Sequence, residues 1–314
     1  MEVISMPMWA WILFYALVIV MLYADLKLFG RKGQHEVSIK EALQMTCVWI
    51  AVSLIFCAGI GHFENGDKAM EFLAGYLIEK SLSMDNLFVF LMLFSFFGVQ
   101  RKDQHEVLFW GIFGALILRS IFIFAGAAMV QRFEWILAIF GVFLIYTGIK
   151  MFGHQEESVD PSKNIFVKLF KKFFPVTDQM HEDKFFIIEN GKRLATPLFI
   201  ALLVIETTDV AFAVDSIPAV FSVSRDPFIV LTSNIFAILG LRALYFALAA
   251  IAQYFQYLKY GLGIILSFVG VKMLLEVFWH IKVDTPISLL IIFGVLVLSM
   301  VASYVATSYS RRRQ

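Results

Sequence analysis

Long apolar runs recur along this chain and decide what it can fold into. A helix needs about 20 apolar residues to cross the roughly 30 Å of hydrocarbon in a bilayer. Only 16% of the residues are charged, whereas a soluble chain has about a quarter. We therefore predict an all-α polytopic membrane protein with about nine transmembrane helices, at residues 7–25, 42–61, 72–97, 106–131, 133–152, 197–222, 228–250, 258–279 and 285–307.

The placement of Lys and Arg between these runs predicts the orientation. Cytoplasmic loops carry an excess of both residues. In a nine-span chain one side collects Lys27, Arg31, Lys32, Lys40, Arg101, Lys102, Lys163, Lys168, Lys171, Lys172, Lys184, Lys192, Arg193, Lys259, Arg311, Arg312 and Arg313. We therefore expect the N-terminus outside and the C-terminus in the cytoplasm. The first run lacks a basic start, which indicates an uncleaved anchor rather than a signal peptide.

Several other classes of protein are excluded. The net charge of +1 provides no basic field for nucleic acid, so no nucleic-acid partner is expected. Cys47 and Cys57 would lie about 15 Å apart on one helix, too far for a disulfide. The chain has neither a His pair spaced for zinc catalysis nor a phosphate-cradling Gly loop. We therefore expect neither an enzyme, nor an ATP-driven step, nor a resident cofactor.

The chain also contains an internal repeat. Three segments of the first half resemble segments of the second half in the same order: 79–86 matches 209–216, 111–119 matches 234–242, and 141–151 matches 263–273. Each copy holds three spans, so two tandem copies must cross the membrane in opposite senses. Inverted three-helix repeats of this kind are typical of secondary transporters, whose substrate binds near the midplane between the halves.

The repeat divides the chain into five parts. They are two N-terminal transmembrane helices (1–70), repeat A (71–153), a cytoplasmic loop (154–196), repeat B (197–280), and a last helix with a basic tail (281–314). In the loop, Asn190 and Gly191 have the character of a primed turn, so residues 185–196 predict a small hairpin. His154 and His181 have acidic neighbours, but we interpret them as residues of a solvated loop.

Eight charged residues lie in the interior of the third, fourth, sixth and seventh predicted spans: Glu79, Lys80, Asp85, Arg119, Glu206, Asp209, Asp215 and Arg242. Each charge near a helix centre costs about 2.5–3.5 kcal/mol, and such charges mark ion pathways or buried pairs. Arg119 and Arg242 are expected to pair with carboxylates or to hold the repeats in register. Five acids against three bases leave two negative charges over. A bound divalent cation or protonated carboxylates could balance them, and in a cation/proton exchanger both would occur in turn.

The spacing of the acids constrains the site. Glu206 and Asp209 share a helix face, whereas Asp209 and Asp215 are about 120° apart around a straight helix. Convergence on one ion therefore needs a local break or a wide cavity, and Pro218 predicts such a break in the sixth span. We interpret the five acids as metal ligands, with Asn86 as a neighbouring oxygen donor. Hard oxygen ligands suit Mg²⁺, Ca²⁺ or Mn²⁺.

Three segments carry a resemblance to a known family. Residues 75–86, 206–219 and 232–243 resemble the TerC membrane-protein family of the LysE-type transporter superfamily, and within it the Alx-type manganese exporters. The likeness covers nearly the whole chain. It implies export of Mn²⁺ across the bacterial inner membrane, with the acidic motif positions carried onto Glu79, Asp85, Glu206, Asp209 and Asp215. The alternative is a non-transporting membrane scaffold of a metal or tellurite stress-response complex, recruited through residues 154–196.

Overall fold

The computed structural model describes residues 6–30, 39–133, 135–153, 164–177, 184–189, 191–251 and 258–311. Its helices are α1 (Met8–Gly30), α2 (Ile39–Phe63), α3 (Gly66–Phe97), α4 (Arg101–Arg132), α5 (Ile136–Lys150), α6 (Ile165–Phe173), α7 (Pro197–Phe221), α8 (Pro227–Leu239), α9 (Leu241–Ile251), α10 (Leu258–Trp279) and α11 (Thr285–Arg311). The strands β1 (Phe186–Glu189) and β2 (Lys192–Ala195) form one antiparallel hairpin, at the place where the sequence predicts it.

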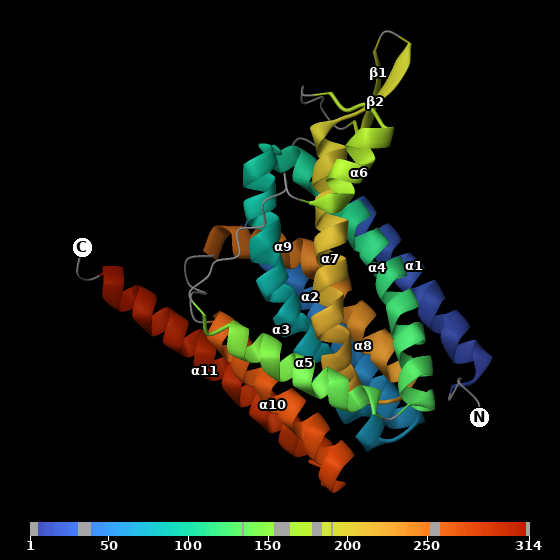
Figure 1. Cartoon of the computed structure of the whole chain (residues 1–314), viewed down its shortest axis with the longest axis vertical. Helices are drawn as coiled ribbons and strands as arrows, with labels where there is room; N and C mark the ends of the chain where they lie inside the picture. Colours follow the sequence, from blue (N-terminus) through green and yellow to red (C-terminus); the bar gives the residue numbers. More distant parts are fainter. Residues whose placement is uncertain are drawn as a thin grey trace.

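The helices confirm an all-α polytopic membrane protein (Figure 1). Among the described residues, six helices are long and apolar enough to cross a membrane: α1, α2, α4, α7, α10 and α11. The bent pair α8–α9 makes a seventh if it is counted as one span. The helix α5 has only 15 residues, so the count of nine spans stays a prediction.

Local sequence signals set several helix ends. Asn65 caps α3 through a hydrogen bond that its side chain accepts from Lys68 N, and Gly98 ends that helix at φ 63°, where a side chain would be strained. Asp226 caps α8 in the same way, with Pro227 at the first helical position. The lengths of α3 and α8 are therefore specified by their own end residues.

The expected break in the sixth span is wrong, and the break lies in the seventh span instead. Helix α7 runs unbroken through Pro218, because this residue stands in the last turn and its missing donor affects only the helix end. The two helices α8 and α9 meet at Gly240 with a bend of 41°. A Cβ at position 240 would lie 3.0 Å from Lys80 Nζ and 3.1 Å from Trp49 Cβ, so a larger residue would be crowded at the bend.

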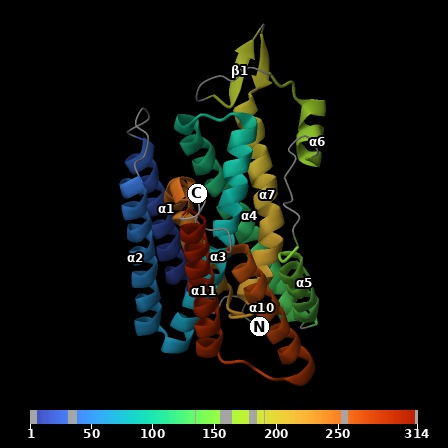
Figure 2. The same ribbon diagram turned by 90° about the vertical axis from the view of Figure 1, so that its left-hand side faces the viewer.

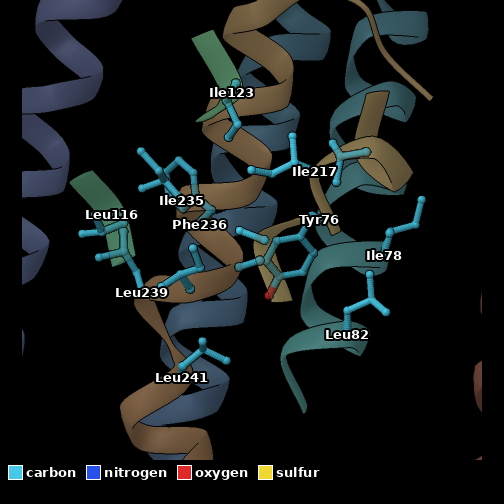
Figure 3. Packing of buried hydrophobic residues seen from close by; sticks show 14 of the residues in the cluster. Tyr76, Ile78, Leu82, Leu116, Ile123, Ile217, Ile235, Phe236, Leu239 and Leu241 are labelled. Atoms are coloured by element: carbon cyan, nitrogen blue, oxygen red, sulfur yellow. The ribbon is translucent and has the colours of Figure 1, made fainter. Parts of the chain in front are cut away.

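Helix α8 is the centre of the core. Every one of its residues is buried, which leaves no face of this helix for lipid. Figure 3 shows Ile235 and Phe236 of α8 among side chains of α3, α4 and α7, including Tyr76 and Ile217. A helix enclosed in this way is positioned by protein contacts on all sides, so groups that it carries can be held rigidly.

Helices α5 and α10 pack closely at glycines. A Cβ at Gly148 would lie 2.6 Å from the carbonyl oxygen of Gly263, and one at Gly270 would lie 2.5 Å from that of Gly141. The two helices are antiparallel, because the residue number rises along one while it falls along the other. Only glycine permits this approach of the two backbones.

The two ends of the helical bundle differ. The hairpin and the connection between α3 and α4 lie at one end, and α1 begins at the opposite end (Figures 1 and 2). At the hairpin end Phe186 packs on Phe199, the third residue of α7, with ring centroids 4.6 Å apart. We refer to this end as the hairpin end, which the Lys and Arg distribution predicts to be cytoplasmic.

Candidate functional site

Arg119 lies at the centre of a buried ionic cluster formed by α3, α4 and α7. Its side chain is fully buried and donates two hydrogen bonds to the Asp209 carboxylate, at 3.1 and 2.9 Å. Its Nη1 also contacts Glu79 Oε1. One cation therefore holds two carboxylates from different halves of the chain, and the bidentate geometry with Asp209 is the strong form of such a pair.

Neutral side chains complete this cluster. Asn234 of α8 donates to the second oxygen of Glu79 at 2.8 Å, and Ser83 donates to the first at 2.9 Å. Ser216 Oγ and Asn234 Oδ1 lie 3.2 and 3.3 Å from Arg119 Nη1. Both oxygens of Glu79 are therefore bound, as a buried charge requires. With Glu79 and Asp209 both ionised, these two and Arg119 together carry one negative charge.

Glu206 stands one helical turn before Asp209, toward the hairpin end. Its Oε2 is buried and accepts no hydrogen bond from the residues that the structure describes. Its carboxylate lies against Gly114 of α4, where a Cβ would come within 2.0 Å of Oε1. A buried carboxylate oxygen without a donor is unfavourable, so this group needs a proton or a cation.

We expect Gly114→Ala to test how firmly the Glu206 carboxylate is held. The added methyl group must displace the carboxylate, so the free energy of unfolding should fall by about 1–3 kcal/mol. In a Glu206→Ala background the same change should be nearly neutral, because the displaced group is gone. Unfolding in detergent measures both effects, with Gly59→Ala as the control, since nothing lies within 4 Å of a Cβ at that position. If Gly114→Ala lowers the free energy of unfolding equally in the wild-type and Glu206→Ala proteins, the Glu206 carboxylate does not lie against Gly114.

Asp215 faces a different helix from Asp209. Thr147 of α5 lies 3.4 Å from its Oδ1, whereas Asp209 faces Arg119 of α4. This divergence is the one that a straight helix imposes on residues six apart. The cluster and Asp215 therefore lie on two different faces of α7.

The other predicted site residues are distributed around the cluster. Asn86 is buried in α3. Asp85 lies in the same helix, but its side chain is outside the described part of the structure, as are His154 and His181. Within the described residues, no three His, Cys, Asp or Glu side chains are grouped closely enough to hold a metal ion. The predicted ligands whose side chains the structure describes therefore do not form one coordination sphere in this conformation.

The two remaining bases contact partners that spacing did not indicate. Arg242 Nη1 lies 3.2 Å from Asp25 Oδ2 of α1, and both side chains are buried. Lys80 Nζ donates to the carbonyl oxygen of Ala237 at 3.0 Å, in the last turn of α8 before the bend. A cation there stabilises the end of a helix whose carbonyls lack partners.

Sequence reasoning missed Asp25 and Lys272. Asp25 is 5% exposed and Lys272 is 6% exposed. Asp25 is the last residue of the first predicted span, and a charged residue at that position is expected at the membrane surface rather than in a buried pair. Lys272 had a visible signal, because it lies inside the eighth predicted span and matches Lys150 in the repeat.

A small cavity adjoins the cluster. It has a volume of about 20 Å³, and Asp209 is the charged residue in its wall, beside apolar residues such as Leu87, Leu108 and Ile205. That volume is enough for about one water molecule. The wall residues of α4 and α7 belong to the halves of these helices nearer the hairpin end, so the cavity lies on that side of Arg119.

Comparison with known proteins adds three findings. The sequence model of the integral membrane protein TerC family matches residues 64–312. An uncharacterised membrane protein of Myxococcus xanthus, STKORF319, is 47% identical over 300 residues, which cover 96% of this chain and 93% of its own. An Escherichia coli K12 protein, named as a candidate membrane-bound redox modulator, Alx, is 46% identical over 310 residues, covering 96% and 95%. No solved structure matches this chain.

Proposed function

Because the chain belongs to the TerC family of integral membrane proteins, we propose that it exports divalent cations, most specifically Mn²⁺, from the cytoplasm across the bacterial inner membrane. Proton entry drives export, and the N-terminus lies outside with the C-terminus in the cytoplasm. The observation that carries the proposal is Glu206, a half-buried carboxylate with one buried oxygen that accepts no hydrogen bond from the described residues. Such a group favours alternate occupation by a proton and a cation.

Helix α7 supplies the proposed route. Glu206, Asp209 and Asp215 span nine residues, which is about 14 Å of helix rise. A cation binds first at Glu206, reaches Asp209 when Arg119 moves toward Glu79, and leaves past Asp215. Arg119 therefore acts as a gate, since its bidentate contact occupies Asp209 in this conformation. Carboxylate oxygens are suitable ligands for a hard cation such as Mn²⁺.

Contacts between the halves support the inverted repeat within this proposal. Gly141 corresponds to Gly263 in the repeat, and Gly148 corresponds to Gly270. The contacts cross, because Gly141 meets Gly270 and Gly148 meets Gly263. A two-fold axis produces this exchange of partners, and the packing of α3 on α8 and of α4 on α7 follows the same rule. In transporters of this plan the substrate binds between the halves.

Flux of Mn²⁺ into proteoliposomes tests the proposal. We expect Glu206→Gln and Asp215→Asn each to lower the initial rate by about tenfold, as the loss of one charged contact implies. Glu276→Gln is the matched control, because this carboxylate pairs with Arg225 at the surface. The mechanism is ruled out if wild-type protein moves no Mn²⁺, or if both variants keep the wild-type rate while folded. A pH dye inside the vesicles should respond when Mn²⁺ is added if protons are exchanged.

The scaffold hypothesis predicts a different outcome. The hairpin projects from the end of the bundle (Figure 1), and Ile188 on it is 79% exposed, as a recruiting segment would be. If the protein recruits partners, replacement of residues 187–194 by a short linker removes its function and leaves any Mn²⁺ flux intact. If the protein is an exporter, the same replacement preserves most of the flux and of the cellular phenotype.

A further inference from the structure

Helix α6 lies beside the first part of α7 (Figure 2). At its start, Asn164 Nδ2 donates to Thr207 Oγ1 at 2.8 Å. Near its end, Phe170 packs on Phe199 with ring centroids 5.0 Å apart. The two helices are therefore antiparallel. Thr207 lies ten residues after Pro197, about 15 Å along α7, which is roughly half the thickness of a bilayer core.

This position places α6 at membrane depth. If α7 enters the hydrocarbon near its first residue, then α6 begins near the bilayer centre and rises toward the hairpin end. Asn164 fastens this start, because its Oδ1 also accepts hydrogen bonds from Phe166 N and Val167 N. The amide thus caps α6 and attaches it to α7. A segment that sequence reasoning assigned to a soluble loop lies against a transmembrane helix.

The outward face of α6 is apolar. Val167 is buried, whereas Ile165, Phe166, Leu169 and Phe173 are 53–77% exposed. Four large apolar side chains on nine residues would be unfavourable in water. Acyl chains would remove that cost, and α4, which packs on α7, also presents exposed apolar residues, Trp110 and Phe113. The apolar face of α6 therefore has the same chemical character as the exposed surface of the transmembrane helices.

The lysines of α6 are concentrated toward the hairpin end of the helix. Lys171 and Lys172 lie in its last turn, nearer the hairpin end, and Lys168 lies one turn before Lys172. Lysine side chains at such positions extend their ammonium groups to the membrane surface. The cytoplasmic leaflet carries anionic lipids, and each lysine near them contributes about a fivefold gain in affinity. The lysines and the apolar face therefore match the same partner.

We infer that α6 is embedded in the cytoplasmic leaflet, with its apolar face against acyl chains and its three lysines on anionic lipid headgroups. This inference goes beyond the proposed export and holds whatever the cargo is. It requires that α7 enters the membrane near its first residue, and it rests on the proposed orientation, in which the hairpin end is cytoplasmic. The occupant is lipid rather than a second protein, because the lysines complement anionic headgroups and because the apolar residues lie beside α7 at the depth of the acyl chains.

Spin labels test the depth of α6. In a variant with Cys47 and Cys57 replaced, nitroxides are attached at Phe166→Cys and, as a control, at Ile188→Cys on the hairpin. In vesicles we expect the label at position 166 to collide with oxygen and to be shielded from a water-soluble nickel complex, and the label at 188 to show the reverse. Nickel access at 166 equal to that at 188 overturns the inference. Shielding from both reagents also overturns it, because protein would then cover the face.

Charge-matched variants test the headgroup contact. Replacing Lys168, Lys171 and Lys172 with Gln should lower the preference for spin-labelled phosphatidylglycerol over phosphatidylcholine at the protein surface by about threefold or more. Replacing Lys184, Lys192 and Arg193 with Gln changes the net charge equally and should leave the preference unchanged. An unchanged preference in the first variant, or an equal loss in the second, contradicts the headgroup contact. Neither measurement depends on Mn²⁺ flux, so failure here is distinct from failure of the export proposal.

Discussion

Replacing Arg119 with Gln is expected to lower the free energy of unfolding by about 3–5 kcal/mol, which is the effect of removing one partner from a buried ion pair. The guanidinium is fully buried between Glu79 and Asp209, so its loss leaves two carboxylates facing each other without a cation. Unfolding in detergent or mixed micelles measures the effect. The control is Arg225→Gln, whose pair with Glu276 is partly exposed and should contribute at most about 1 kcal/mol.

A compensating variant separates charge from packing. If the loss comes from unpaired carboxylates, then Arg119→Gln with Glu79→Gln and Asp209→Asn should recover most of the stability, because the three amides can hydrogen-bond to one another. The changes in unfolding free energy are then strongly non-additive, because the two carboxylate substitutions stabilise the Arg119→Gln protein. If the triple variant is no more stable than Arg119→Gln, the side chain stabilises the fold by packing, and the ionic description of the cluster is wrong.

The sequence predicts which charges are buried better than it predicts their partners. Burial of Glu79, Arg119 and Asp209 follows from apolar neighbours, a local property. Their convergence depends on how α3, α4 and α7 pack, and these residues are 40 and 90 positions apart. The pair of Arg242 and Asp25 is separated by 217 positions, and no repeat or periodicity links these two residues.

Two local features show where sequence reasoning fell short. A proline breaks a helix only when it stands well inside it. Pro218 stands in the last turn of α7, so the helix runs through it, and the bend lies at Gly240 instead. In the predicted loop, apolar residues at 165, 166, 169, 170 and 173 already have the spacing of one helix face. The structure forms helix α6 over these residues. A nine-residue helix is too short for its sequence to indicate a membrane contact. Its position beside α7 is what indicates one.

The glycine contact between α5 and α10 should also be sensitive to substitution. We expect Gly148→Ala and Gly270→Ala each to lower the free energy of unfolding by about 1–3 kcal/mol or more. The added Cβ would meet backbone carbonyls at 2.6 and 2.5 Å, and backbone cannot move aside as a side chain can. Gly294→Ala in α11 is the control, since nothing lies within 4 Å of a Cβ there. Unfolding in detergent measures all three.

The double variant tests whether the two glycines belong to one contact. Gly148 and Gly270 are equivalent positions in the two repeats, and each lies against the other helix. A single separation of α5 from α10 relieves both clashes, so Gly148→Ala with Gly270→Ala should be destabilised by clearly less than the sum of the single variants. Additive losses would mean that the backbone shifts independently at the Gly148–Gly263 and Gly141–Gly270 approaches. The two single losses need not be equal, because a Cβ at Gly148 also meets Ser267 whereas one at Gly270 also meets the larger Ile145.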